Sequence, residues 1–451
     1  MIETIRNAWK LPELRKKILF TVFALLIFRL GSAVPVPYIN SDALGATLNG
    51  LGGIFALMGT MNGTAFSMAA VFALGVQPYI NSSIIIQLLT VAIPALERLQ
   101  RDGGEEGRKK IAAITRYVTV AIALLQGFGY YTLIKSYGLL DIGSISGIWA
   151  GIVIVLCFTA GSAFVMWLGE QITEFGIGNG ISIILFAGIL SRGPAMVKTM
   201  IDGVSHWLNP VDADVFATWT EAQQNAYFVL PAWGVPLIIV GMLAIVVFIV
   251  FITNAERRIP VQYAKRVVGR KMYGGQSSHI PMKVNMAGVM PIIFAQAIAS
   301  LPATVGMFFG KSAQSEGAWG TVLKVFDTSS ILYIVVYFLL IVGFSYFYST
   351  MQFNPVEVAN NLKKNGGFVP GFRPGKPTAD FIHKVLNKIT MFGALYLAVI
   401  AIAPIITGNV IGASNLAVGG TSIIIVVGVA LETTKAMEAQ MLMRHYKGFL
   451  E

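Results

Sequence analysis

The chain has 451 residues, of which 55% are hydrophobic and 12% are charged, and its mean hydropathy is +0.70. A soluble domain carries roughly 25% charged residues, so this composition excludes that class and predicts an all-α polytopic membrane protein. The formal net charge is +11, and the single cysteine, Cys157, excludes a disulfide framework within the chain.

Ten apolar stretches are long enough to cross a hydrocarbon core of about 30 Å, which takes about 20 helical residues. The segment before the first stretch is basic, as in a signal peptide, but no convincing small-residue cleavage site follows it. We therefore interpret the first stretch as an uncleaved span, and we expect Arg29 near its outer end to snorkel to the lipid headgroups. The ten predicted spans cover approximately residues 18–34, 75–94, 117–134, 149–168, 181–198, 232–252, 286–309, 331–350, 390–407 and 419–437.

Most of the 33 Lys and Arg residues fall in alternate segments between these spans. Because basic loops stay in the cytoplasm, this bias predicts that both ends of the chain are cytoplasmic. The spans divide the chain into four regions. These are an N-terminal half with spans one to five at 1–200, an outer joining loop at 201–231, a C-terminal half with spans six to ten at 232–437, and a tail at 438–451.

The segment before the second span is apolar, but Gly52, Gly53, Gly59 and Gly63 interrupt it and disfavour a helix that faces lipid. Non-helical backbone is tolerated at membrane depth only where protein or a water-filled cavity surrounds it. We interpret residues 51–68 as a re-entrant segment that folds back into a cavity, ahead of a span that forms an apolar constriction. A loop and a helix in an ordinary bundle explain this segment equally well.

Two of the predicted cytoplasmic loops, 253–284 and 352–389, are long and carry much of the positive charge. The first alternates apolar and polar residues around Ile259 to Ala264 and again after Gly269, which predicts two strands joined by a turn. The second contains the run Val369 to Gly375, whose Pro and Gly content is typical of a tight exposed turn with an arginine at its tip. Both loops are therefore predicted to be rigid docking sites for nucleic-acid phosphates or an acidic protein face.

Motifs for catalysis or metal binding are few. The four histidines lie in loops and in the tail without Cys, Asp or Glu at metal-binding spacing, and the sequence has no P-loop, GxSxG or HExxH motif. The glycine-rich run 175–181 lacks the strand and helix of a dinucleotide site, so we interpret it as a turn. Charged residues are nearly absent from the spans, which disfavours an ion-coupled pump. We predict no metal, no cofactor and no enzymatic activity.

Five segments resemble, in order, the signature segments of the SecY family, whose members form the channel of the bacterial Sec protein translocon. The segments are FALGVQPYINSSIIIQLLT, WLGEQITEFGIGNGISII, ERRIPVQYAKRVVGRKMYGGQSSHIPMKVNMAGVMPIIFA, NPVEVANNLKKNGGFVPGFRPGKPTADFI and GGTSIIIVVG. The resemblance covers nearly the whole chain. It implies two inverted five-helix halves around a central hourglass pore, which opens sideways to lipid between the second and seventh spans.

The resemblance also implies four groups of site residues. The pore ring would consist of Val76, Ile80, Ile181, Leu185, Ile293 and Ile425. The lateral gate would contain Ser82, Ser83, Gln87, Asn285, Gln296 and Leu301. The plug, at about 51–68, would include Met58, Met61, Asn62 and Phe66. The docking site for SecA or the ribosome would comprise Arg257, Arg258, Lys265, Arg266, Arg270, Lys271, Arg373 and Lys376.

Physical chemistry supports the ring, because aliphatic side chains offer no hydrogen bonds to water or ions and such a ring closes by dewetting. Without the resemblance, the same residues read more simply as aliphatics that face lipid or a helical core. For the gate, burying Gln87 and Asn285 against lipid costs free energy unless they pair. We therefore expect Gln87→Leu or Asn285→Leu to favour the closed gate.

The resemblance further implies the partners and the location of the chain. Partners would be the SecE and SecG subunits, the SecA ATPase, a translating ribosome whose RNA contacts the basic loops, signal peptides and unfolded precursor proteins, and membrane lipids. The location would be the bacterial inner membrane. The energy for transport would come from SecA or the ribosome, and hydrophobic segments would leave sideways into lipid.

Two other functions are compatible with a polytopic membrane protein. A secondary transporter with inverted repeats predicts saturable flux of a small solute and a buried charged site. A membrane enzyme such as a lipid-modifying transferase predicts a cluster of His, Asp or Glu at the membrane surface, and only Glu170 and Glu174 come close to that. Neither alternative explains two cationic loops on one side.

Overall fold

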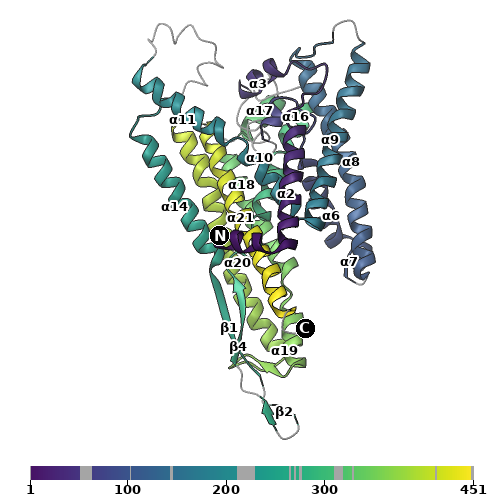
Figure 1. Cartoon of the computed structure of the whole chain (residues 1–451), viewed down its shortest axis with the longest axis vertical. Coiled ribbons are helices and arrows are strands. Elements are labelled where there is room, and N and C mark those ends of the chain that lie inside the picture. The colour runs from purple at the N-terminus through teal and green to yellow at the C-terminus, as the bar shows by residue number, and fades with distance from the viewer. Residues whose placement is uncertain are drawn as a thin grey trace.

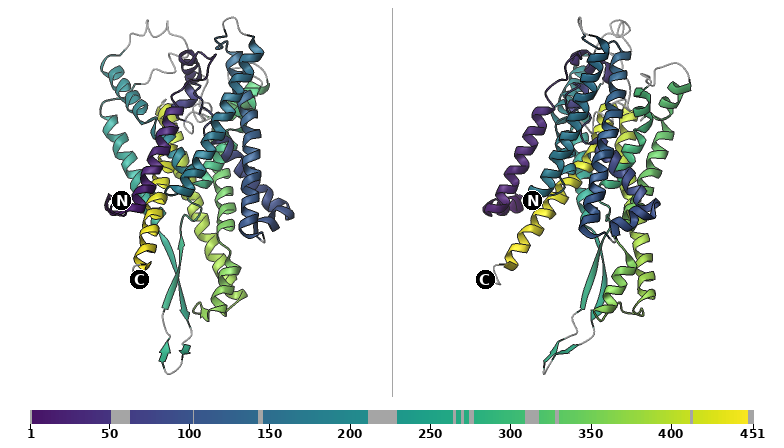
Figure 2. Two further views of the ribbon diagram at one scale, coloured as in Figure 1. Left: turned by 45° about the vertical axis from the view of Figure 1, so that its right-hand side comes forward. Right: turned by 90° about the vertical axis from the view of Figure 1, so that its right-hand side faces the viewer.

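Long helices pack side by side in one bundle, and a β-hairpin projects from one end of it (Figure 1). We call this end the hairpin end, and the opposite end the far end. The C-terminus lies on the side of the hairpin end (Figure 2). The computed structural model describes residues 2–50, 63–101, 103–142, 146–210, 229–263, 266–268, 271–273, 277–308, 318–327, 330–411 and 414–447.

The described helices fall into long helices of the bundle and short helices at its two ends. The long helices are α2 (Pro12–Gly31), α6 (Gln77–Ala92), α8 (Gly104–Ser136), α9 (Gly147–Phe175), α10 (Gly180–Leu190), α11 (Gly193–Leu208), α14 (Gly234–Asn254), α15 (Met290–Ala299), α18 (Ile331–Gln352), α20 (Lys376–Ile411) and α21 (Ser414–Lys447). The short ones are α1 (Ile2–Lys10), α3 (Ser41–Gly50), α5 (Thr64–Ser67), α7 (Pro94–Arg101), α16 (Leu301–Phe308), α17 (Ala318–Val325) and α19 (Pro355–Lys364).

By length and composition, six helices in the described part of the chain could each cross a membrane, or seven if the bent pair α6 and α7 counts as one span. The bend between α6 and α7 is 105°. It falls at Ile93, which is extended because it precedes Pro94. The first, seventh and tenth predicted spans coincide with α2, with α15 and α16 together, and with α21. The chain is therefore a polytopic all-α membrane protein.

The largest hydrophobic core lies in the middle of the bundle and draws buried side chains from α2, α6, α9, α10, α14, α15, α18, α20 and α21. Glycines allow close backbone contacts in it. A Cβ on Gly161 of α9 would collide with the carbonyl oxygen of Val71, and a Cβ on Gly180 of α10 would collide with the carbonyl of Gly169. Asn179 begins α10, because its side chain accepts hydrogen bonds from the N–H groups of the next turn.

A three-stranded antiparallel sheet stands at the hairpin end. Its strands are β1 (Glu256–Tyr263), β4 (Ser277–Lys283) and β5 (Gly367–Phe368), in the order β4-β1-β5. Ile259 of β1 lies opposite Ile280 of β4, which confirms the predicted hairpin. A second hairpin of β2 (Arg266–Val268) and β3 (Lys271–Tyr273) follows at its tip (Figure 2). The pairing of β5 with β1 was not predicted, and it joins the two basic loops into one projection.

Candidate functional site

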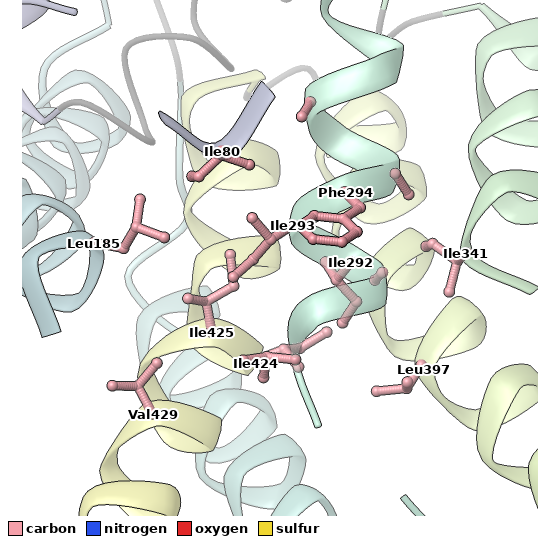
Figure 3. Close-up of a cluster of buried hydrophobic side chains, with 14 of the residues drawn as sticks. Ile80, Leu185, Ile292, Ile293, Phe294, Ile341, Leu397, Ile424, Ile425 and Val429 are labelled. Carbon is pink, nitrogen blue, oxygen red and sulfur yellow. The ribbon is translucent and has the colours of Figure 1, made fainter. Parts of the chain in front are cut away.

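Aliphatic side chains from four helices gather at the centre of the bundle (Figure 3). Ile80 of α6, Leu185 of α10, Ile293 of α15 and Ile425 of α21 are each no more than 3% exposed. Val76, which caps α6, belongs to the same hydrophobic core, and the partly buried Ile181 packs against this core. Aliphatic side chains offer no hydrogen bonds to water or ions, so a contact of this kind between helices favours a dry closure.

A cavity of about 400 Å³ opens beside this cluster, toward the hairpin end of α9. Ile80, Ile181, Leu185 and Ile293 line its apolar part. Its other lining residues are mostly polar and include Tyr79, Ser83, Gln87, Arg116, Glu170, Glu174, Asn179 and Tyr348. The cavity is thus bordered by polar side chains on one side and by aliphatic side chains on the other.

An ion pair holds part of the polar wall in place. Arg116 of α8 donates from Nε to Oε1 of Glu170 on α9 at 2.8 Å, and both side chains keep contact with water. Glu170 and Glu174 were singled out from the sequence as the nearest approach to an acidic surface cluster. In the structure Glu170 is bound to an arginine, and the described part of the chain holds no group of three or more His, Cys, Asp or Glu side chains that could bind a metal ion.

The predicted plug is described only from residue 63 onward, and Met58, Met61 and Asn62 lie outside the described residues. Residues 63–76 are mostly irregular, with the single turn of α5. Their backbone is nevertheless paired: the Val36 N–H donates to the Ala69 carbonyl at 3.0 Å, and the Val71 N–H donates to the Val34 carbonyl at 2.9 Å. Irregular backbone buried in this way is tolerated at membrane depth because protein satisfies its polar groups.

Phe66 fixes α5 inside a second core at the far end of the bundle. Its ring stacks on Tyr130 of α8 with centroids 4.8 Å apart, and the Tyr130 hydroxyl donates to the Phe66 carbonyl oxygen at 2.6 Å. Arg29 was expected only to reach the headgroups. It is exposed, but its Nη1 also donates to the Thr64 hydroxyl at 3.3 Å, so α2 contacts the start of this segment.

Tyr130→Phe is expected to loosen the segment that carries Phe66. The substitution leaves the buried carbonyl of Phe66 without this donor, which costs about 1–3 kcal/mol, while the stacking of the rings is kept. Urea unfolding of the purified chain would measure the lost stability, and accessibility of a cysteine at Thr64 (Thr64→Cys in a Cys157→Ser chain) would report loosening. Tyr131→Phe, which removes an exposed hydrogen bond from α8 to the Gly147 carbonyl at the start of α9, is the matched control. Equal labelling rates in both variants would contradict the anchoring role of Tyr130.

The seam between α6 and α15 is the predicted lateral gate, and the two helices are in contact. Gln87 of α6 accepts a hydrogen bond at its Oε1 from the hydroxyl of Tyr348 on α18, at 3.0 Å, and donates from Nε2 to Ser83 at 3.1 Å. The ring of Tyr348 lies 5.2 Å from that of Phe294 on α15. Gln87 therefore contacts a helix of the C-terminal half, and Ser83 is hydrogen-bonded to it.

The other four predicted gate residues differ in their surroundings. The hydroxyl of Ser82 donates at 2.7 Å to the Thr115 carbonyl on α8. Asn285 lines one small cavity with Ser349 of α18 and Thr390 of α20, and a second cavity with residues of α14 and α21. Leu301 is 45% exposed at the start of α16, and Gln296 is buried on α15.

Sequence reasoning missed a second polar contact across the same seam. Gln77, the first residue of α6, is 1% exposed, and its Nε2 lies 3.4 Å from the hydroxyl of Ser300, which follows α15. A buried amide at the start of an otherwise apolar span was the available signal, because such a group requires a partner. Tyr348 carried no comparable signal, since aromatic residues are frequent on α18.

Gln87→Leu is expected to open the seam, which reverses the direction that the sequence suggested. The substitution removes the acceptor of the Tyr348 hydroxyl in the closed arrangement, while water can replace that acceptor once the helices part. A loss of about 1 kcal/mol in the stability of the closed arrangement lowers its population relative to the open arrangement about fivefold. Ser83→Ala, which removes only the bond within α6, is the control. The disulfide yield between cysteines placed on α6 and α15 measures the closed population, and an unchanged yield in Gln87→Leu would contradict the inference.

The basic projection presents arginines on both of its loops. Arg257 and Arg258 are exposed on β1, where Arg258 also pairs with Glu256 at 2.6 Å. Arg373 is exposed in the turn before α20, and the Thr378 hydroxyl holds its carbonyl at 2.8 Å. The ring of Phe372 stacks on Phe381 at 4.2 Å, which makes the turn rigid.

The other predicted docking residues lie partly in described elements and partly outside the described residues. Lys376 is exposed at the first residue of α20. Arg266 lies in β2 and Lys271 in β3, and Lys265 and Arg270 lie outside the described residues. A cavity of about 630 Å³ between β1 and the Arg373 turn is lined by Arg257, Arg258, Lys388 and apolar residues such as Phe372 and Phe381. The two loops thus form one cationic surface.

Comparison with known proteins decides the family. The family model named SecY matches residues 70–434, which is most of the chain. The chain belongs to the SecY family. SecY relatives include the protein translocase subunit SecY of Streptomyces coelicolor, 43% identical, and that of Bacillus subtilis, 41% identical, each over 100% of this chain and 100% of the relative.

Solved structures show the same fold at low sequence identity. A structure of a protein conducting channel covers 97% of this chain and 97% of its own, with a TM-score of 0.63 and 16% identity. Sec61 in a canine ribosome-channel complex covers the same shares with a TM-score of 0.59 and 15% identity. SecY is a family of channel subunits, so this chain is a SecY-type translocase subunit and not an enzyme.

Proposed function

We propose that this SecY-family chain conducts unfolded polypeptides across the bacterial inner membrane and releases hydrophobic segments sideways into lipid. The observation that carries the proposal is the aliphatic cluster of Ile80, Leu185, Ile293 and Ile425, which closes a cavity whose mouth is polar. Such a cluster binds no solute by hydrogen bonds or charge, but it can part around an extended chain of any sequence. A small-solute transporter instead needs a fixed polar site.

The positive-inside bias supports an orientation in which the hairpin end and both termini are cytoplasmic. The cavity mouth then faces the compartment in which precursors are made. Residues 1–200 and 232–437 would form the two halves, and the seam between α6 and α15 would be the side exit. In this view residues 63–76 continue the plug on the outer side of the ring.

The cationic projection supports docking of the SecA ATPase or of a ribosome, and one structural relative is Sec61 in a ribosome-channel complex. Exposed arginines at fixed positions attract acidic protein faces and RNA phosphates. SecE and SecG would complete the membrane complex, and signal peptides would enter at the cavity. In this proposal SecA or the ribosome supplies the energy for transport, because the chain itself is a channel subunit.

The proposal is tested by translocation into reconstituted vesicles. Vesicles that hold this chain with SecE receive SecA, ATP and an unfolded secretory precursor, and protection of the precursor from added protease is measured. Vesicles that hold SecE alone, and reactions without ATP, are the controls. We expect protection only in the complete reaction. Saturable uptake of a small solute, with no protected precursor despite bound SecA, would favour the transporter instead.

A further inference from the structure

The first helix, α1, lies differently from every long helix in the bundle. It runs across the end of α2 rather than along the bundle (Figures 1 and 2). The turn between them occurs at Leu11, which is extended and followed by Pro12 at the first position of α2. A helix held crosswise at the end of a span lies in the plane where a membrane meets water.

The residues of α1 divide cleanly between two faces. Thr4, Arg6, Asn7 and Lys10 fall on the polar side of the sequence IETIRNAWK, and the apolar residues recur at intervals of three and four. Trp9, on the apolar side, is 48% exposed although it is the largest side chain of the helix. An amphipathic ring that is left uncovered in this position suits the boundary between headgroups and acyl chains.

The protein itself covers only one strip of α1. Ala8 is fully buried in a small core with Leu14 of α2, Ile177 and Met437 of α21. The Thr4 hydroxyl donates to Oε1 of Glu438 on α21 at 3.1 Å. Trp9 lies next to this strip and is not covered by it. One side of α1 therefore contacts α21, while the protein leaves the apolar surface at Trp9 exposed.

Five basic residues surround the turn between α1 and α2. Arg6, Lys10, Arg15 and Lys16 are exposed, and Lys17 reaches Gln440 of α21 at 3.3 Å. The acidic groups near them are Glu3 and Glu13 on the same segment and Glu438 on α21, so the local charge stays positive. Clustered Lys and Arg beside an interfacial helix attract anionic headgroups.

We propose that α1 is an interfacial helix that binds the anionic phospholipids of the membrane surface, with Trp9 in the apolar boundary and Arg6 and Lys10 at the headgroups. This site goes beyond the channel function, since it needs only the membrane location. It also has a consequence for the core. Because α1 contacts α21, and α21 carries Ile425 of the aliphatic cluster, the lipid surface fixes one wall of that cluster.

The test places a fluorophore on each side of α1 in the full chain. Trp9→Cys and Asn7→Cys, each in a Cys157→Ser chain, are labelled and reconstituted in vesicles of phosphatidylcholine, with or without phosphatidylglycerol. Quenchers that reside in the acyl region or in water report where each label lies. We expect the label at position 9 to be quenched from the lipid, more so with phosphatidylglycerol, and the label at position 7 to be quenched from the water. Equal access of the aqueous quencher to both would overturn the interfacial position.

Charge reversal separates headgroup binding from simple insertion. Arg6→Glu and Lys10→Glu should each weaken the phosphatidylglycerol-dependent part of the quenching at position 9 about fivefold, the effect of one cation near an anionic surface. Lys135→Glu reverses an exposed cation in the last turn of α8 and should leave the quenching at position 9 unchanged. Quenching that is equal in neutral and anionic vesicles would overturn lipid recognition. Loss of the effect on adding free inorganic phosphate at constant ionic strength would show a soluble-anion site and would overturn the proposal too.

Discussion

Arg373→Glu is expected to abolish SecA-driven translocation while leaving the chain folded. The Arg373 side chain is exposed and takes part in no ion pair among the described residues, so the turn does not depend on its charge. The turn is instead held by its backbone, through Thr378, and by the stacked rings of Phe372 and Phe381. A reversed charge at a docked surface replaces an attraction by a repulsion, and losing one partner of a close charge pair costs about 2–5 kcal/mol in binding.

The measurement compares SecA affinity and protease-protected precursor for the parent chain and the variant. Lys364→Glu is the matched control, because it reverses an exposed charge at the end of α19 in the same loop. We expect Lys364→Glu to retain most activity and Arg373→Glu to lose it. If the two variants translocate equally, the docking surface lies elsewhere on the projection, and the assignment of Arg373 is wrong.

Ile80→Asp is expected to make the resting channel leak ions. Ile80 is buried among the aliphatic side chains of four helices, and a carboxylate there has no described partner. Burying a polar group without a partner costs roughly 2–7 kcal/mol, so the cluster admits water instead. A change of about 2 kcal/mol in the free-energy difference between the dry cluster and the water-filled cluster changes the ratio of their populations about thirtyfold.

Potassium flux from vesicles that hold the chain with SecE, without SecA or precursor, measures the leak. Ile80→Leu keeps an aliphatic side chain of equal size and is the control for altered packing. The expected order is a large flux in Ile80→Asp and a low flux in Ile80→Leu and the parent chain. A sealed Ile80→Asp chain that is still folded and still translocates would show that the ring lies at another level.

The sequence was sufficient for those features that depend on the chain's own periodicity and composition. Each predicted span overlaps a described helix, and alternation in the first basic loop predicted the hairpin of β1 and β4. The grouping of the predicted ring residues could not come from periodicity, because a local period does not tell which faces of different helices meet. It came from the family resemblance, which supplies the three-dimensional arrangement that local patterns lack.

The sequence could not supply the direction of individual side chains or the pairing of distant segments. Polar residues occur on several sides of α6, so the sequence could not tell that Ser82 faces α8 while Gln87 faces α18. Asn285 lies before α15 begins, where no helical period applies. The pairing of Gln262 with Phe368 joins residues distant in sequence through a two-residue strand, too short to leave a pattern.

The sheet at the hairpin end also has a mechanical consequence. Only Ala255 separates α14 from β1, and β4 leads within a few residues into α15. Since β5 is hydrogen-bonded to β1, the segment before α20 moves with the same sheet. A force on the hairpin would therefore act on three helices, α14, α15 and α20, and α15 carries Ile293. A partner docked on this short sheet, as proposed above, would thus be connected to the centre of the bundle without entering it.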